Sequence, residues 1–300
     1  MVDGIKRDSI GFIGLGDMGG TIAERIVEGG FPLMVCDLRA EAVAHLVARG
    51  AVAAANPAAL GAACDIVFIC VVNDGQVLAL VRDHLAPAMR PESVLIIISS
   101  VRPETMTAIA GMLSADRQDG SAVAVLDAPV SGSRPAAAAG TLTLMIGGDG
   151  SALDRARPVL ESFSRRIFHT GALGTGQAMK IANNVMLHMN HLLALEAVRF
   201  ARSQGMDEKQ LIEIVNTSSG RSWVTENWGL IDDMFRDHPQ AGTDGIYDMM
   251  VKEMWNAVLI AKGTGTWMPM TGLGVQVGRA FHEERERDLG IVHGAGAGKA

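Results

Sequence analysis

The feature that most constrains this chain is a glycine pattern, Gly14, Gly16 and Gly19, which directly follows the apolar run 10–13. Gly14 permits a tight turn, Gly16 lets another molecule approach the backbone, and Gly19 lets a helix pack closely on a strand. The helix expected after the loop directs its N-terminal N–H groups toward it. The pattern GxGxxG between a strand and a helix therefore predicts a doubly wound α/β domain at the N-terminus.

Short apolar runs alternate with helical segments throughout the first half. Each run is nearly continuous in Val, Ile and Leu, as in a parallel strand that is buried on both faces. The alternation of strand and helix indicates a doubly wound sheet of the Rossmann type. The expected strands are 10–13, 33–36, 66–71, 94–98 and 123–126, with 141–146 as one further strand.

The second half predicts helices only. Residues 177–202 contain no proline and repeat apolar residues at helical spacing, which indicates one long helix. We expect further helices at 208–216, 246–261 and 274–287. The sequence therefore predicts a Rossmann-type domain at 1–170, an all-α domain at 171–293 joined to it through the long helix, and a flexible tail at 294–300.

An acidic residue stands where a dinucleotide site requires one. Asp37 ends the second expected strand, 18 positions after Gly19. A carboxylate there accepts hydrogen bonds from the adenosine ribose and repels a 2′-phosphate, which favours NAD over NADP. Arg39 keeps NADP open as the alternative, because an arginine near the ribose accommodates that phosphate. The expected cofactor residues here are Gly14, Leu15, Gly16, Asp17, Met18, Gly19 and Asp37.

Composition narrows the class of partner and the compartment. The net charge of −7 at pH 7 argues against a general nucleic-acid binder. The three cysteines, Cys36, Cys64 and Cys70, have no metal-ligand spacing and fit a reducing compartment. The sequence contains neither a signal peptide nor an apolar run long enough to cross a membrane. We therefore expect a cytoplasmic protein with no membrane partner.

Four further segments carry a resemblance to a known family. They are 127–133 (DAPVSGS), 140–143 (GTLT), 174–184 (GTGQAMKIANN) and the pair Lys252-Glu253. Together with the glycine loop, they resemble the β-hydroxyacid dehydrogenases, the family of 3-hydroxyisobutyrate dehydrogenase and tartronate semialdehyde reductase. The resemblance extends from about residue 10 to 285.

The resemblance implies a role for each matching residue. Lys180 is the expected catalytic acid/base and Asn184 the residue that holds the substrate. The turn after the fifth strand is expected to bind the substrate carboxylate, and Lys252 to approach both nicotinamide and substrate. The carboxylate-binding residues are Ser131, Gly132 and Ser133, and the cofactor site also includes Val71, Val72, Ser100 and Lys252. The resemblance also implies a homodimer or homotetramer.

The chain departs from the family pattern in ways that leave the substrate open. Ser133 and Arg134 stand where a second glycine is usual after Ser-Gly, and Glu253 replaces a common aspartate. Ile97 replaces an aspartate before the pair Ser99-Ser100. The expected substrate is a small β-hydroxyacid or its semialdehyde or keto acid.

The chemistry suits a lysine that is followed one turn later by an asparagine. Oxidising an alcohol releases a hydride to the nicotinamide and a proton to a side chain. A lysine amine has a reference pKa of about 10.4, which burial and a neighbouring positive charge lower toward neutrality. Lys180 and Asn184 lie at i and i+4, so both face the same side of the helix.

Two other functions remain open at this stage. One is an NADPH-dependent imine reductase of the same architecture, and the other is a non-catalytic dinucleotide-binding protein. Relatives of both kinds usually lack the lysine, so Lys180 argues against them.

Several other residues keep two interpretations each. His188 and His191 lack further ligands and favour packing over a metal site. The tryptophans Trp223, Trp228 and Trp255 line a pocket or pack in the core. Arg221 binds a second anionic group or lies on the surface beside a helix cap.

Overall fold

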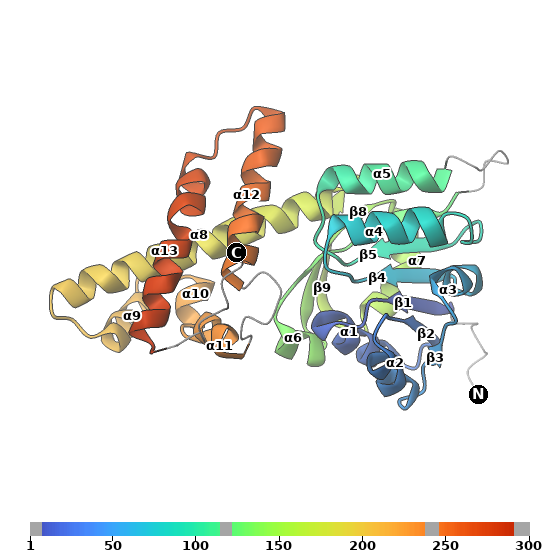
Figure 1. Cartoon of the computed structure of the whole chain (residues 1–300), viewed down its shortest axis with the longest axis horizontal. Coiled ribbons are helices and arrows are strands. Elements are labelled where there is room, and N and C mark those ends of the chain that lie inside the picture. Colours follow the sequence, from blue (N-terminus) through green and yellow to red (C-terminus); the bar gives the residue numbers. More distant parts are fainter. Residues whose placement is uncertain (1–7, 115–121, 238–245, 291–300) are drawn as a thin grey trace, which may run out of the picture. The chain divides into compact units, whose positions relative to one another are not determined.

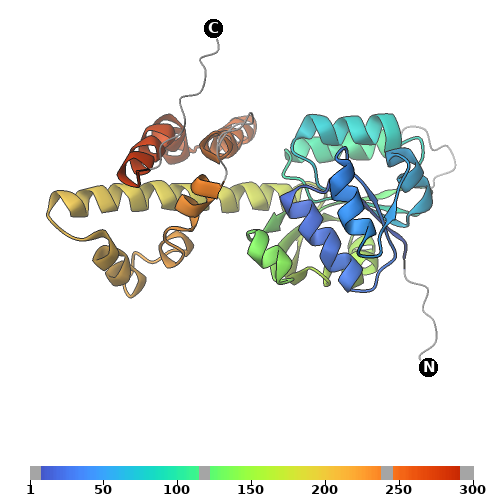
Figure 2. The same cartoon turned by 60° about the horizontal axis from the view of Figure 1, so that its bottom comes forward.

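The computed structural model of the chain describes residues 8–114, 122–237 and 246–290. The chain divides into two compact units, Met1–Lys180 and Ile181–Ala300. In the first unit helices cover both faces of a sheet, and in the second the described residues form helices and connecting turns (Figures 1 and 2). The expected Rossmann-type sheet followed by an all-α region is confirmed. The tail expected at 294–300 lies outside the described residues.

The first unit is built on a parallel sheet. Its strands are paired in the order β3-β2-β1-β4-β5-β6. The strand order reverses between β1 and β4, and sheets of this kind bind ligands beyond the carboxyl ends of the strands at such a reversal. The strands are β1 (Ile10–Ile13), β2 (Leu33–Cys36), β3 (Val52–Ala53), β4 (Ile66–Ile69), β5 (Val94–Ile97) and β6 (Ala124–Asp127).

Three more strands extend this sheet beyond β6. The strand expected at 141–146 is β8 (Leu142–Gly148), which runs antiparallel to β6 and to the short β7 (Val130–Ser131). Next to β8 lies β9 (Ser164–Gly171), in parallel. Sequence analysis did not predict β9, because most of its residues are exposed and it lacks the apolar run of a buried strand.

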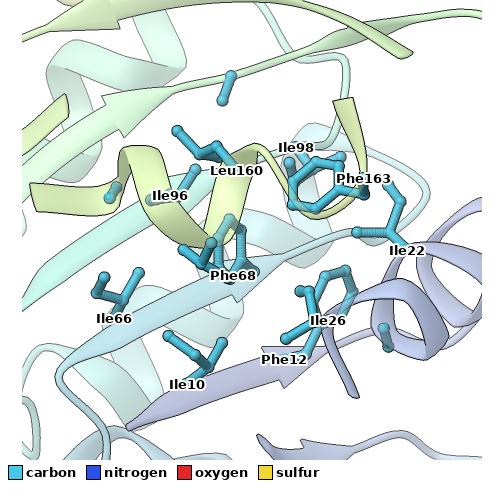
Figure 3. Packing of buried hydrophobic residues seen from close by; sticks show 14 of the residues in the cluster. Ile10, Phe12, Ile22, Ile26, Ile66, Phe68, Ile96, Ile98, Leu160 and Phe163 are labelled. Carbon is cyan, nitrogen blue, oxygen red and sulfur yellow. The ribbon is translucent and has the colours of Figure 1, made fainter. Parts of the chain in front are cut away.

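Alternate residues of each central strand pack into two separate cores. Phe12 and Phe68 stack with ring centroids 5.7 Å apart and face α1 and α7 (Figure 3). Val67 and Ile69, which precede and follow Phe68 on β4, face the opposite core against α3 to α5. The helices of this unit are α1 (Asp17–Glu28), α2 (Ala40–Val47), α3 (Pro57–Ala63), α4 (Asp74–Leu80), the π-helix η1 (Val81–Leu85), α5 (Pro103–Ser114), α6 (Arg134–Ala138) and α7 (Gly150–Leu160).

The long helix α8 (Thr175–Ser203) begins in the first unit and continues into the second. It contains the whole of the helix expected at 177–202. The helices expected at 208–216, 246–261 and 274–287 are also present, the last two longer than expected. The other helices of the second unit are α9 (Glu208–Asn216), α10 (Trp223–Glu226), α11 (Leu230–Asp237), α12 (Ile246–Thr264) and α13 (Pro269–Asp288).

A buried arginine joins three of these helices. Arg285 of α13 is 5% exposed and donates to Glu208 of α9 at 2.8 and 3.0 Å and to Asp232 of α11 at 2.8 Å. Its guanidinium lies over the Trp228 ring, 5.1 Å from the centroid. The buried charge is therefore paired on two sides, as burial of an ion requires.

Among the helices of the described ranges, none combines the length and the apolar character that a membrane span needs.

Candidate active site

The glycine loop between β1 and α1 has room for a ligand at one position only. A Cβ at Gly14, whose φ is +94°, would lie 2.2 Å from the Cys70 carbonyl oxygen, and one at Gly19 would lie 2.1 Å from that of Gly14. A Cβ at Gly16 would meet no protein atom within 4 Å. The protein's own packing therefore requires Gly14 and Gly19, whereas the bare backbone at Gly16 faces open space. This arrangement fits a pyrophosphate at the N-terminus of α1.

Asp37 is held against the same loop. Its carboxylate accepts hydrogen bonds from the backbone N–H of Leu15 at 2.5 Å and of Arg39 at 2.8 Å. Burial raises the pKa of Asp37, but these N–H groups and the Arg39 guanidinium outweigh it, so the pKa lies below its ordinary value. Asp37 is therefore a carboxylate at neutral pH.

The remaining cofactor candidates lie at the carboxyl ends of β4 and β5. The Val71 backbone N–H donates to the Ser99 hydroxyl at 2.8 Å, while Val72 is 80% exposed and Ser100 is exposed. Leu38, which sequence analysis did not select, is fully exposed directly after Asp37. These exposed apolar side chains flank β1 on the edge of the sheet where the glycine loop lies.

A buried carboxylate anchors the start of α8. Asp127, at the end of β6, is 0% exposed and accepts the backbone N–H groups of Gly174 and Gln177, each at 2.7 Å, on its two separate oxygens. Gly174 has a φ of +91°, and a Cβ at Gly176 would lie 2.7 Å from Asp127 Oδ2. Burial raises the pKa of Asp127, and the backbone donors oppose that shift. The glycines of the GTG segment therefore let the strand end cap this helix.

Gln177 extends the anchor to the loop after β5. Its amide nitrogen donates to the Ser99 carbonyl oxygen at 2.8 Å, and its amide oxygen accepts the Val101 N–H at 3.1 Å. Lys180 follows three residues later on α8 and is half-buried. The helix that carries Lys180 is thus fastened to the ends of both β5 and β6.

The expected carboxylate turn lies between β7 and α6. Ser131 ends β7, Gly132 has a φ of +133°, and Ser133 is the N-cap of α6 without accepting a hydrogen bond on its side chain. Arg134 begins α6 and is exposed. Hydroxyl groups and backbone N–H groups therefore meet at one short turn.

In the helical unit, Asn184 belongs to a buried polar group. Its amide nitrogen donates to Glu253 Oε2 of α12 at 2.8 Å, and His188 Nε2 lies 2.6 Å from the same oxygen. Asn184 and His188 are buried, whereas Lys252 is exposed.

The other residues with open interpretations differ in their burial. His188 and His191 are both buried. Trp228 lies in the buried network around Arg285, whereas Trp223 and Trp255 are about half exposed. Arg221 pairs with Glu226 at 3.3 Å beside the capping box that Ser222 and Thr225 form at α10.

Two sets of candidates are each brought together within one unit. The glycine loop, Asp37, Val71, Val72, Ser100, Asp127 and the first turn of α8 lie around the carboxyl edge of the sheet. Asn184, His188 and Glu253 meet in the helical unit. Sequence analysis assigned no role to Asp127, Gln177 or the pair His188 and Glu253. A clue to Asp127 was available, since an acidic residue at a strand end has to find donors.

Comparison with known proteins gives matches along nearly the whole chain. Residues 9–171 match a family model described as the NAD binding domain of 6-phosphogluconate dehydrogenase, and residues 174–293 match one described as NAD-binding of NADP-dependent 3-hydroxyisobutyrate dehydrogenase. An NAD-dependent L-serine dehydrogenase of Pseudomonas aeruginosa is 35% identical, covering 94% of this chain and 96% of the relative. A 3-hydroxyisobutyrate dehydrogenase of the same organism is 37% identical over 72% of this chain and 71% of its own.

A solved structure of 3-hydroxyisobutyrate dehydrogenase from Mycobacterium tuberculosis with L-serine is also similar. It has a TM-score of 0.78 at 26% identity and covers 94% of both chains.

Proposed function

We propose that this chain, which belongs to the β-hydroxyacid dehydrogenase family, interconverts a small β-hydroxyacid and its semialdehyde or keto acid with Lys180 as general acid/base. Membership makes it an NAD(P)-dependent oxidoreductase of hydroxyacids. The observation that carries the proposal is the anchored start of α8. Asp127 and Gln177 fasten this helix to the carboxyl edge of the dinucleotide-binding sheet, and Lys180 follows within one turn.

The proposed proton transfer follows from the positions of the side chains on α8. The chemistry that a nicotinamide cofactor would supply when bound is to take up the hydride from the carbon atom that bears the hydroxyl group. Lys180 Nζ takes the hydroxyl proton in oxidation and returns it in reduction. Asn184, one turn further along α8, holds the reacting oxygen, while Ser131, Gly132 and Ser133 bind the substrate carboxylate. Lys252 completes the proposed site near nicotinamide and substrate.

The test of this proposal is Lys180→Ala. We expect kcat for the best hydroxyacid to fall about 10²- to 10⁴-fold, the usual loss for a general acid or base, with the Kd for the dinucleotide unchanged. Small primary amines added to the assay should restore part of the rate. The control is Lys209→Ala, at an exposed lysine of α9. Turnover at the wild-type rate by Lys180→Ala would contradict the role of Lys180 as general acid/base.

We propose NAD as the preferred cofactor. Asp37 is ionised and repels a 2′-phosphate, and the Arg39 guanidinium is engaged with Asp37 at 3.3 Å and with the Leu15 carbonyl oxygen at 2.8 Å. We expect kcat/KM to favour NAD over NADP by at least about tenfold, equivalent to about 1.4 kcal/mol. Asp37→Asn should narrow that ratio by raising kcat/KM for NADP. A wild-type preference for NADP would overturn this assignment.

The substrate within the hydroxyacid class is best identified with a panel. It should contain 3-hydroxyisobutyrate, glycerate with tartronate semialdehyde, 4-hydroxybutyrate with succinate semialdehyde, a sulfonated analogue, and L-serine, which the similar Pseudomonas enzyme oxidises by name. Each is assayed with NAD and with NADP. Absence of turnover with every compound would favour a non-catalytic dinucleotide-binding protein.

We propose that a second copy of this chain covers one face of α8, giving a homodimer or homotetramer. Met179, Met186, Leu193 and Phe200 are each at least 50% exposed and recur every seven residues. A seven-residue apolar repeat is the pattern of helices that pair side by side, and an exposed apolar stripe of this length marks an interface. We expect Leu193→Lys to shift the assembly toward monomers in light scattering, with Glu196→Gln as control. A monomeric wild type at assay concentration would contradict this.

The cytoplasmic location expected from the cysteine content stays a prediction, and cell fractionation tests it.

A further inference from the structure

One carboxylate in the helical unit receives two donors on a single oxygen. Glu253 Oε2 lies 2.8 Å from Asn184 Nδ2 and 2.6 Å from His188 Nε2. Asn184 is 7% exposed and His188 is 3% exposed, and the two lie one turn apart on α8. Glu253 comes from α12, and its side chain is 26% exposed. The contact therefore joins two helices through buried donors and one partly solvated acceptor.

The contact with Glu253 determines which ring nitrogen of His188 donates. Its Nδ1 is buried and has no hydrogen-bond partner among the described residues. A carboxylate oxygen only accepts, so an Nε2 without a proton would turn a lone pair toward Oε2. The short contact is therefore one in which Nε2 donates to Glu253.

The same oxygen determines which way the Asn184 amide faces. A carboxylate has no proton to donate, so only the NH₂ end of the amide can approach it. A flipped amide would place Asn184 Oδ1 against the negatively charged Oε2. The Asn183 amide nitrogen, 3.2 Å from Asn184 Oδ1, supports the same orientation. One N–H of the Asn184 amide therefore donates to Glu253, and its Oδ1 and second N–H point away from Glu253.

We propose that Glu253 and His188 act together as positioning residues that fix the orientation of the Asn184 amide. The inference rests on the proposed function, in which Asn184 holds the reacting oxygen of the substrate. His188 matters because Glu253 has one more rotatable bond than the aspartate common in the family. The Nε2 donor restrains that longer side chain and keeps Oε2 against Asn184.

The main test is Glu253→Met, which keeps the length of the side chain and removes the acceptor oxygen. A glutamine would not serve, because its one amide oxygen can still accept both donors. Without an acceptor the orientation of Asn184 is no longer determined, and we expect kcat/KM for the hydroxyacid to fall about 10- to 100-fold, since small misplacements at a reacting centre cost this much. The dinucleotide Kd should change little, and the assay is run below the Tm of the variant, because two buried donors lose their acceptor. A shift of the Asn184 side-chain amide signals in NMR spectra should accompany the loss without any substrate present.

The role of His188 is tested by two substitutions and a double-mutant cycle. His188→Ala should lower kcat/KM, and His188→Gln, which keeps a donor near Oε2, should recover part of it. Because both residues act through one contact, Glu253→Met combined with His188→Ala should lose no more than Glu253→Met alone. Full additivity of the two losses would overturn the proposal.

A matched control exists in the first unit. His45 Nε2 and Glu24 Oε1 lie 2.7 Å apart on the surface of that unit. Glu24→Met removes the same kind of pair without an asparagine beside it and should leave kcat/KM within about twofold.

Two outcomes separate this inference from the proposed function. If Asn184→Ala abolishes turnover while folded Glu253→Met keeps the wild-type kcat/KM, only the positioning role is wrong. If Lys180→Ala and Asn184→Ala both retain turnover, the proposed function itself fails, and the positioning role fails with it.

Discussion

Individual glycines in the nucleotide loop serve different purposes. Gly14 and Gly19 are required by the protein's own backbone, because a Cβ at either would lie about 2 Å from a carbonyl oxygen. Gly16 has no such neighbour. Replacing one of these glycines by alanine can therefore distinguish an effect on folding, expected at Gly14 and Gly19, from an effect on ligand binding, expected at Gly16.

We predict that Gly16→Ala weakens dinucleotide binding while the fold is kept. The free energy of unfolding without cofactor should change by less than about 1 kcal/mol, because alanine is a poorer helix N-cap than glycine but also restricts the unfolded chain, and the two effects oppose each other. The Kd for NADH should rise at least about tenfold. Gly19→Ala is the comparison and should lower the free energy of unfolding by about 1–3 kcal/mol or more. Titration calorimetry and urea unfolding measure both, and unchanged binding by Gly16→Ala would contradict the prediction.

Two buried histidines make stability depend on pH. Burial lowers the pKa of His191 to about 3 and that of His282 to about 4, and the positive charges of neighbouring histidines add to the effect. Their rings lie 5.0 Å apart, and Arg285 also lowers the pKa of His191. In the unfolded chain a histidine titrates near pH 6.5. Below that pH the unfolded state binds protons that the folded state does not, so stability falls as the pH falls.

We predict a loss of about 2 kcal/mol per histidine between pH 7 and pH 5, because each histidine costs about 1.4 kcal/mol for every pH unit below about 6.5. Urea unfolding at a series of pH values measures it. His282→Gln should remove about half of this slope, whereas His45→Gln, at an exposed histidine, should leave it intact. This pH range lies above the pKa of Glu208. Burial raises the pKa of Glu208, but its hydrogen bonds from Arg285 and Trp228 outweigh burial and lower the pKa to about 2. A flat profile from pH 7 to pH 5 would rule out this account.

At the level of elements, the start of α8 depends on a cap from a distant strand. Asp127 accepts Gly174 N–H on one carboxylate oxygen and Gln177 N–H on the other. The surface helix α7 has a local cap instead, in which Asp149 Oδ1 alone accepts both Ser151 N–H and Ala152 N–H. An asparagine can reproduce the second arrangement but not the first, because it has one acceptor oxygen.

We predict that Asp127→Asn lowers the free energy of unfolding by about 1–3 kcal/mol, the cost of leaving a buried donor unpaired. Asp149→Asn should cost less than about 0.5 kcal/mol, because asparagine caps helices about as well as aspartate. Asp127→Asn should also lower kcat, since Lys180 lies on the helix that loses its anchor. Equal losses in the free energy of unfolding for Asp127→Asn and Asp149→Asn would contradict the prediction.

At the scale of the whole molecule, the donors that pair Asp127 limit where the first domain can end. The division 1–170 and 171–293 remains a proposal about architecture. The donors that pair Asp127 lie at 174–177, beyond that boundary and within the unit Met1–Lys180. A fragment that stops at 170 would therefore bury a carboxylate without its partners.

We predict that a fragment 1–180 is more stable than a fragment 1–170 by at least about 2 kcal/mol. Urea unfolding followed by circular dichroism compares the two. Asp127→Leu should raise the stability of the shorter fragment and lower that of the longer one. Identical unfolding midpoints for the unsubstituted fragments would contradict the prediction.

Local pattern alone determined the strands β1, β2, β4, β5, β6 and β8, the glycine loop, the Asp37 position and the long helix of this protein. These features depend on neighbours in sequence, namely apolar runs, helical spacing and glycines at fixed intervals. Tertiary structure decided the rest. The pairing of Asp127 with residues 47 and 50 positions later, and of Glu253 with Asn184 and His188, has no local signal. The physical reason is that a buried polar group must find its partner wherever the folded chain brings one, and sequence spacing does not encode that distance.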